Sequence, residues 1–114
     1  MRKFPFLEVF GAIHMTLLSD TQKKYLRSLG HGLKPVVMVG GNGITPALLR
    51  EADITLDSHE LIKVRLRVGD REARDTAIAA IVDATGATLV QRIGHVALLY
   101  RRHPEQPGII LPSG

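Results

Sequence analysis

Hydrophobic and polar positions switch between helical and strand periods along the chain, and this pattern predicts its elements in turn. Ser19–Gln22 fits a capping box, in which the serine and the glutamine satisfy each other's backbone amides. A helix is therefore expected over 20–29, ended by Gly30. Leu26 and Leu29 mark its buried side, and the basic residues of this segment fall on the other side.

A continuous apolar run follows. Val36–Val39 predicts a strand buried on both faces, as in an interior or parallel strand. The glycine-rich segment Gly40–Gly43 breaks that strand. Thr45 is a favourable N-cap and Pro46 suits the first helical position, so a second helix is expected to end near Ser58.

The segment 60–68 alternates between aliphatic and polar residues, which predicts a strand with one buried face. Its other face carries Lys63, Arg65 and Arg67, spaced by about 6.6–6.8 Å. No acid interrupts this stripe after Glu60, although like charges in a row repel one another. The stripe is either an ordinary solvated surface or a surface that contacts phosphate, and the pattern leaves both interpretations open.

The last part of the pattern predicts a helix and a hairpin. Asp70 can cap a helix that ends before Gly86, and two strands, 88–93 and 96–101, flank a Gly-His turn. Helices between the earlier strands imply right-handed crossovers and parallel neighbours. We expect an α/β domain of order α-β-α-β-α-β-β, with a single mixed four-stranded sheet, helices mainly on one face and the other face open.

The two ends of the chain differ from its middle. Residues 1–14 hold all three phenylalanines and show no helical or strand period, so we expect an N-terminal extension. Residues 104–114 are rich in proline and glycine, which is typical of a tail. The domain itself is expected over 15–103. No apolar run reaches the roughly 18–20 residues of a membrane span, so no membrane partner is expected.

Charge and composition narrow the class of partner. A chain of 114 residues is one domain, and the absence of cysteine excludes disulfides, thiol nucleophiles and cysteine-bound zinc. The net charge is +4, and the surplus lies in residues 1–69, with 10 basic and 6 acidic side chains, whereas residues 70–114 carry 5 of each. A basic half favours a polyanionic partner, with nucleic acid ahead of a membrane, or it serves solubility alone.

The glycine-rich segment is the strongest candidate for chemistry. Gly40–Gly43 is a Gly-x-x-Gly loop at the head of a helix, a pattern that clamps single-stranded nucleic acid in some folds. A nucleotide-binding P-loop is excluded because Ile44, and not lysine, follows the last glycine. Pro46 excludes a dinucleotide-binding fingerprint. A tight turn with no ligand is the alternative that the pattern leaves open.

Enzymatic chemistry finds no support in the residue pattern. None of the five histidines lies three or four positions from another, so a helical metal-binding pair is absent. No nucleophile, base and orienting group occur in a recognisable arrangement. Only Tyr25 and Tyr100 are aromatic within 15–103, which disfavours recognition by base stacking. We therefore expect no catalysis, no cofactor, no metal and no small-molecule substrate.

Three stretches resemble the CRM domain, the family of chloroplast RNA splicing and ribosome maturation proteins. They are Leu33–Thr45 with its Lys-Pro pair and Gly-x-Asn-Gly loop, His59–Val64, which reads His-Glu-Leu-Ile-Lys-Val, and Gly94–Arg101. The resemblance extends from about Leu17 to Leu111. A single short domain of this kind is similar to the bacterial stand-alone members of the YhbY type.

The resemblance implies an RNA-binding fold related to KH domains and to the C-terminal domain of translation initiation factor three. It implies a cytoplasmic, non-catalytic protein that associates with precursors of the large ribosomal subunit, with ribosomal RNA as partner. Gly41 departs from the family, because many relatives carry a basic or polar residue there, and this weakens phosphate contact at the loop. The residues that the resemblance assigns to RNA binding are Gly40, Gly41, Asn42, Gly43, Lys23, Lys24, Arg27 and Lys34.

A second hypothesis comes from another functional class. The apolar extension 1–14 and the tail 104–114 could dock on a partner protein, which would make the chain an adaptor whose RNA binding is incidental. Deleting the extension separates the two hypotheses, because RNA binding stays nearly unchanged under the first and capture of the partner protein is lost under the second.

Overall fold

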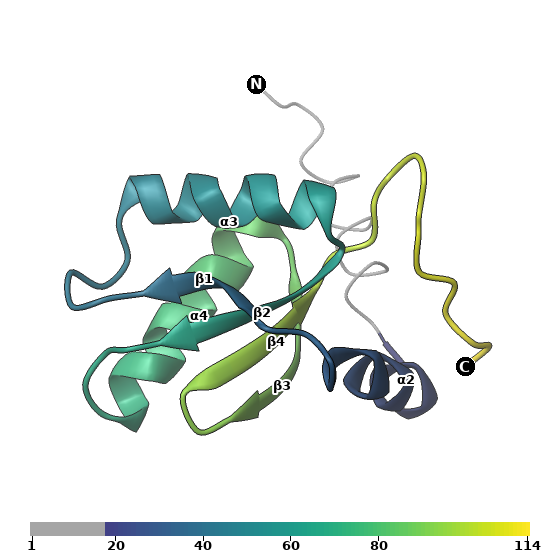
Figure 1. Ribbon diagram of the computed structural model, residues 1–114, viewed down its shortest axis with the longest axis horizontal. Helices are drawn as coiled ribbons and strands as arrows, with labels where there is room; N and C mark the ends of the chain where they lie inside the picture. Colours follow the sequence, from purple (N-terminus) through teal and green to yellow (C-terminus); the bar gives the residue numbers. More distant parts are fainter. Residues whose placement is uncertain (1–17) are drawn as a thin grey trace.

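The elements follow one another in the order that the sequence predicts (Figure 1). The structure, a computed structural model, describes residues 18–114, and the expected extension 1–14 lies outside the described residues. No helix among the described residues is long and apolar enough to cross a membrane. The elements are α2 (Asp20–Gly30), β1 (Pro35–Val39), α3 (Pro46–Ser58), β2 (Leu61–Leu66), α4 (Arg71–Thr85), β3 (Thr88–Ile93) and β4 (Val96–Tyr100).

The four strands form one mixed sheet in the order β1-β2-β4-β3, which confirms the predicted fold class. β1 runs parallel to β2, and the other pairs are antiparallel. The expectation that β1 is buried on both faces is wrong, because β1 is an edge strand. Val37 and Val39 are buried, whereas Val36 and Met38 are 50% and 49% exposed. Their side chains lie on a face that no helix covers at this edge.

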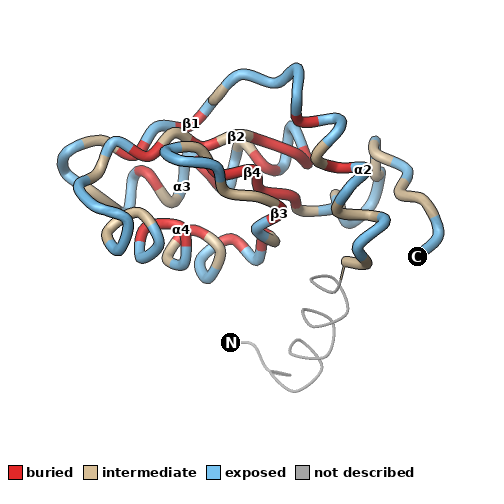
Figure 2. Tube along the Cα trace, turned by 90° about the horizontal axis from the view of Figure 1, so that it is seen from below, coloured by how far each residue is buried: buried red, intermediate tan, exposed pale blue. Residues whose placement is uncertain are grey.

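The first face of the sheet is covered by α3 and α4. Both helices begin at the predicted caps, since Thr45 accepts a hydrogen bond from the Leu48 amide and Asp70 accepts one from the Ala73 amide. Their apolar sides meet the aliphatic positions of the strands (Figure 2). The buried side chains that form this larger core come from the following positions: Val37, Val39, Leu48, Ala52, Leu56, Ile62, Val64, Leu66, Ala77, Ile78, Ile81, Ala87, Ala97 and Leu99.

On the second face, α2 covers one end of the sheet. The expectation that this face is open is therefore correct for the part that α2 does not reach. Leu26 of α2 is fully buried there, but Leu29 is 38% exposed and does not belong to the buried side that the sequence predicted. The buried residues of α2 are Leu26 and Gly30. A Cβ at Gly30 would lie 2.8 Å from Leu98 Cδ2, so a larger residue there would displace the end of the Leu98 side chain or the last turn of α2. Leu61, Val90 and Tyr100 complete this smaller core.

Residues 102–112, here called the strap, contain no helix or strand and also lie against the second face. The buried carboxylate of Glu60, just before β2, accepts backbone N–H bonds from three strap residues: His103 (2.6 Å), Gly108 (2.9 Å) and Ile109 (2.8 Å). Burial alone would raise the Glu60 pKa, but the three hydrogen bonds together outweigh it and lower the pKa below its ordinary value. A single buried acid therefore anchors the strap.

Candidate nucleic-acid interface

The glycine loop, residues 40–43, forms a tight exposed turn between β1 and α3. The Gly43 amide donates to the Gly40 carbonyl (2.9 Å), and Gly43 has φ 69°, a left-handed conformation that favours glycine. A Cβ built at Gly40, Gly41 or Gly43 would meet nothing within 4 Å. The loop is thus open on its outer side, and a ligand backbone can approach it closely.

Some of the backbone N–H groups at this turn already have partners and others do not. Pro46 has no amide proton, and the Leu48 amide is bonded to the Thr45 hydroxyl, so the cap of α3 already uses part of the helix N-terminus. No acceptor among residues 18–114 bonds the amides of Gly41 and Asn42. The amides of Ile44, Thr45 and Ala47 likewise have no acceptor in this part of the chain, so amides on both sides of Gly43 are available to a phosphate.

The hollow beside the loop is lined by one acid and by no cation. A shallow hollow of about 310 Å³ beside the loop is lined by residues that include Met38, Thr45 and Glu51. Glu51 is the only charged side chain among those lining residues. The loop and α2 lie at opposite ends of the molecule (Figure 1). The structure therefore does not bring the predicted loop and the predicted basic helix together.

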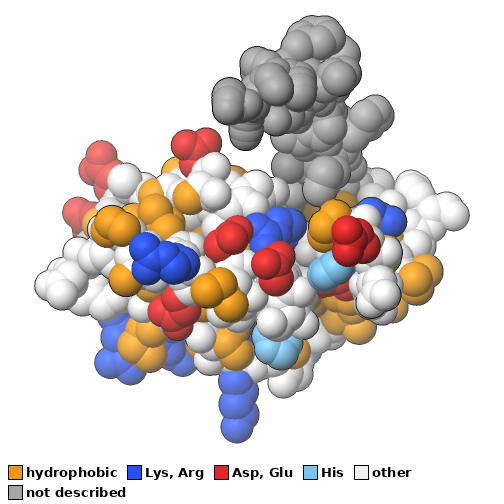
Figure 3. Space-filling view, turned by 90° about the horizontal axis from the view of Figure 1, so that it is seen from above, with side chains coloured by type: hydrophobic (Ala, Val, Ile, Leu, Met, Phe, Trp, Pro, Cys, Tyr) orange, Lys and Arg blue, Asp and Glu red, His pale blue; other side chains and the backbone are white. Residues whose placement is uncertain are grey.

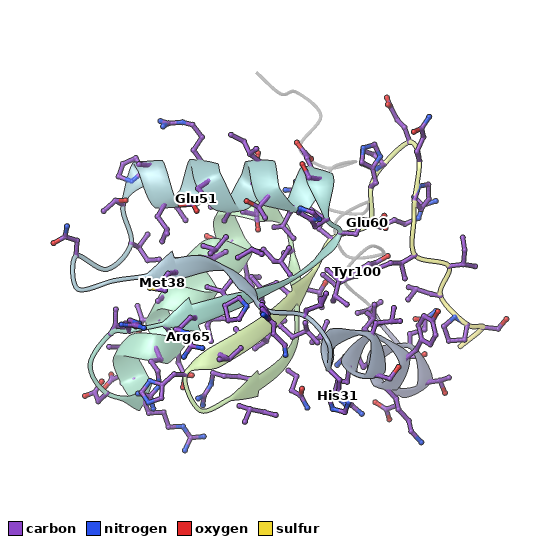
Figure 4. The ribbon with its side chains drawn as sticks, in the orientation of Figure 1. His31, Met38, Glu51, Glu60, Arg65 and Tyr100 are labelled. Atoms are coloured by element: carbon purple, nitrogen blue, oxygen red, sulfur yellow. The ribbon has the colours of Figure 1, made fainter. Side chains whose placement is uncertain are left out.

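Basic side chains converge instead on the uncovered half of the second face. Arg27 from α2 joins Lys63 and Arg65 from β2 around a pocket of about 300 Å³. Figure 4 shows Arg65 on β2 and His31 at the end of α2. We call this hollow the sheet pocket. Its lining residues are Arg27, Gly30, His31, Pro35, Lys63, Arg65, Gln91, Ile93, Val96 and Leu98.

The other predicted cations lie around this pocket without lining it. Lys23 is one helical turn before Arg27 on the same side of α2, and Lys24 is exposed next to it. Lys34 is exposed just before Pro35, which lines the pocket. Arg67 is exposed beyond the end of β2, and its amide donates to the Val39 carbonyl (2.7 Å), which places this residue next to the start of the glycine loop.

The cations of the pocket differ from Arg92 and Arg101 in having no acidic partner among the described residues. Arg92 pairs with Asp75 (2.9 Å), and Arg101 pairs with Asp53 (2.6 Å) and Asp57 (2.8 Å). Within residues 18–114, no acid forms an ion pair with a cation that lines the pocket, and no acid lines it. The α3 side of the molecule, in contrast, shows acidic and basic side chains side by side (Figure 3).

The sequence interpretation missed the aliphatic part of this surface. Lys63 pairs with Leu98, which pairs with Gln91, and Arg65 pairs with Val96. The pocket therefore has an apolar floor on β4 beside its basic rim on β2. The alternation of β2 indicated the rim, but nothing local indicated which strand would lie next to it.

The described residues also bear on catalysis and metal binding. No group of three or more histidine, aspartate or glutamate side chains in residues 18–114 is placed to hold a metal ion. The Tyr100 hydroxyl is buried without a hydrogen-bond partner in this part of the chain. Burial, followed by the nearby Glu60 carboxylate, raises the Tyr100 pKa, so this phenol stays protonated and is unsuited to act as a base.

Comparison with known proteins places these features in a family. The model of the CRS1 / YhbY (CRM) domain matches residues 18–101. A Haemophilus influenzae protein named "RNA-binding protein" is 50% identical over 91 residues, which are 80% of this chain and 92% of that protein. "Probable RNA-binding protein YqeI" of Bacillus subtilis is 33% identical over 96 residues, which are 84% of this chain and all of that protein.

A solved structure shares the fold as well. The solution structure of the Staphylococcus aureus protein SAV1595 is similar with a TM-score of 0.72 and 35% sequence identity. The match covers 84% of this chain and 100% of that one. The described domain therefore corresponds to whole proteins of similar size, with the glycine loop and the sheet pocket inside the matched region.

Proposed function

This chain belongs to the CRS1/YhbY (CRM) domain family, and from that premise we propose that it is a non-catalytic RNA-binding protein. We further propose that its partner is ribosomal RNA in precursors of the large subunit, where it assists assembly in the cytoplasm. Support for RNA comes from the names of the similar proteins. The family resemblance supports the ribosomal target.

One observation carries the proposal: three cations converge on the half of the sheet that no described element covers. Holding Arg27, Lys63 and Arg65 together without an acid is unfavourable for folding alone, because like charges repel. A polyanion relieves that repulsion. Phosphate contacts from lysine and arginine supply most of the affinity of nucleic-acid binding and fix the orientation of the chain.

The proposed RNA path joins the glycine loop to α2. Met38 contributes to the hollow beside the loop and also pairs with Arg65, which lines the sheet pocket. A single strand that contacts the loop amides thus reaches the basic rim by following β1, a length of about 16 Å at roughly 3.3 Å per residue. Lys23, Lys24 and Lys34 then steer the strand from the periphery.

This arrangement predicts strong salt dependence and weak base specificity. Each phosphate neutralised on a single strand contributes a slope of about −0.7 to the logarithm of the binding constant against the logarithm of salt concentration. Neither of the chain's two tyrosines lines the sheet pocket, so tyrosine rings offer no stacking surface there.

Gly43→Asp tests the loop. The aspartate adds a charge and a side chain where the RNA backbone is proposed to approach, and we expect affinity for ribosomal RNA to fall at least about tenfold. Gly86→Asp is the matched control, because Gly86 has a similar φ of 75° and open space around it at the far end of α4. Filter binding with the full chain measures the effect, and equal affinity of both variants contradicts the role of the loop.

Fractionation of a cell lysate on a sucrose gradient tests the ribosomal target. Co-sedimentation of the chain with immature large subunits is expected, and it should diminish in the Gly43→Asp variant. RNA binding in solution combined with sedimentation away from ribosomal particles would retain the RNA-binding proposal and reject its ribosomal part.

A further inference from the structure

We propose that the sheet pocket holds one unstacked nucleotide of the bound RNA, with the base against the aliphatic floor and the phosphate at Lys63 and Arg65. This inference rests on the proposed function, and it assigns a ligand to a site remote from the glycine loop. Its basis is the combination of an apolar floor, a basic rim and a closed end.

The floor is set by the register of three strands. Lys63, Leu98 and Gln91 form one row across β2, β4 and β3, and Arg65, Val96 and Ile93 form the next row. Lys63 and Arg65 therefore have aliphatic residues as their neighbours on β4. No acidic side chain lines the pocket beside them. Such a surface suits a ligand that has a flat, weakly polar part and an adjacent anion.

The closed end of the pocket is the last turn of α2. Gly30 brings this turn against Leu98, and Arg27 and His31 stand at its sides. In this turn the Ser28 and Gly30 carbonyls already accept from the His31 and Leu33 amides, which leaves those of Arg27 and Leu29 without a backbone partner. The negative end of the helix dipole disfavours a phosphate there. The amino groups of a base are suitable donors to those carbonyls, so the base belongs near α2 and the phosphate at the β2 side.

Size and charge point to one nucleotide. The pocket volume of about 300 Å³ is at the small end of the range of about 300–1,000 Å³ found for ligand sites. An acidic peptide would satisfy the cations, but its carboxylates carry no flat apolar group to cover Val96 and Leu98. Ile93, which is 66% exposed, lines the pocket, and Met38, which is 49% exposed, is paired with Arg65 on the neighbouring strand. Both offer further apolar surface to the sugar and base.

The test is an NMR titration of the ¹⁵N-labelled full chain with three probes: single-stranded oligoadenylate or oligouridylate, inorganic polyphosphate, and polyglutamate. We expect the RNA probes to shift the amides of Gln91, Ile93 and Val96 in a saturable way. Polyphosphate and polyglutamate should not shift the amide resonances of Ile93 and Val96, because these two probes carry no base. Equal shifts from either of those two probes would overturn the nucleotide assignment in favour of a simple anion or an acidic peptide.

The same titration separates this inference from the proposed function. RNA-induced shifts confined to residues 40–43 would reject the pocket and keep RNA binding. No shift anywhere with RNA, at a concentration where the parent chain should be saturated, would reject both. Shifts at the pocket and the loop together support both.

A pair of charge variants gives a second readout. Arg65→Gln removes the central cation of the rim, and Arg71→Gln removes an exposed arginine at the start of α4, so the net charge falls equally. We expect Arg65→Gln to lower oligouridylate affinity at least about tenfold, as for one lost charge-assisted hydrogen bond, and Arg71→Gln to leave it nearly unchanged. Circular dichroism confirms that both fold, and equal losses in the two would overturn the inference.

Discussion

The two faces of the sheet are built in different ways. The first is covered by two helices whose side chains form one continuous aliphatic core. The second is covered by one short helix and by the strap, and it ends in the open sheet pocket. The strap depends on a charged group, Glu60, whereas the first face contains no buried charge among the described residues.

The difference separates stability from binding. An aliphatic core is stabilised by area removed from water, and this stabilisation is spread over many residues. The second face keeps part of its surface exposed for a ligand and fixes the rest through a few specific contacts. Variants on the first face should therefore affect the whole domain, and variants on the second face should act locally.

The largest effect is expected from Ile81→Ala on the first face. Ile81 is fully buried between α4 and the sheet, and its truncation leaves a cavity. We expect the free energy of unfolding to fall by about 2–5 kcal/mol, measured by urea denaturation. Ile54→Ala, at a position on α3 that is 59% exposed, is the control, with an expected change within about 0.5 kcal/mol. A small loss for Ile81→Ala would show that this face is not the dominant core.

A smaller effect is expected from Glu60→Ala on the second face. The variant leaves three strap amides without their acceptor, but the strap can detach and hydrogen-bond to water. We expect a loss of about 1–3 kcal/mol in the free energy of unfolding and faster amide hydrogen exchange at Gly108 and Ile109. The amides of α4 should keep their protection. A loss as large as that of Ile81→Ala would mean that the two faces unfold as one unit.

The sequence predicted what is encoded locally. The caps Ser19, Thr45 and Asp70 each specify a helix start within four residues, and all three are confirmed. The parallel pairing of β1 with β2 and the antiparallel hairpin of β3 and β4 followed from the alternation of elements. The expectation that β2 and β3 are neighbours across α4 is wrong, because β4 lies between them. The edge position of β1 could not be read in the same way, because an apolar strand looks alike whether its second face is buried by protein or left for a ligand.

The features that the sequence could not predict are contacts between residues that lie far apart in the chain. The Glu60 carboxylate and the strap amides that it binds are separated by 43 to 49 positions. The sequence marks Gly30 only as a helix stop. In the structure, the close packing of Gly30 against Leu98 also brings the last turn of α2, with Arg27, to the pocket. The basic helix and the basic strand were therefore predicted as two separate sets, and the fold joins one member of the first to two of the second.

The smallest expected effect is the response of the strap to acid. It is also the most direct test of the difference between the two faces of the sheet. Glu60 has a lower pKa in the folded chain than in the unfolded one, so its stabilising contribution is complete above the unfolded value of about 4.3. It is lost as the pH falls through the lower folded value, because a protonated carboxyl cannot accept all three amides. A positive charge on His103 acts in the same direction and holds the Glu60 pKa down.

We therefore expect the amide resonances of Gly108 and Ile109 to shift with a common midpoint below about pH 4.3, while those of buried α4 residues do not move. Glu60→Gln is the control, since an amide keeps one acceptor oxygen and does not titrate in this range. Its strap resonances should be independent of pH. If the strap of the parent chain also stays in place until the whole domain unfolds, then the hydrophobic contacts of Ile109 and Leu111, and not the carboxylate, hold it on the second face.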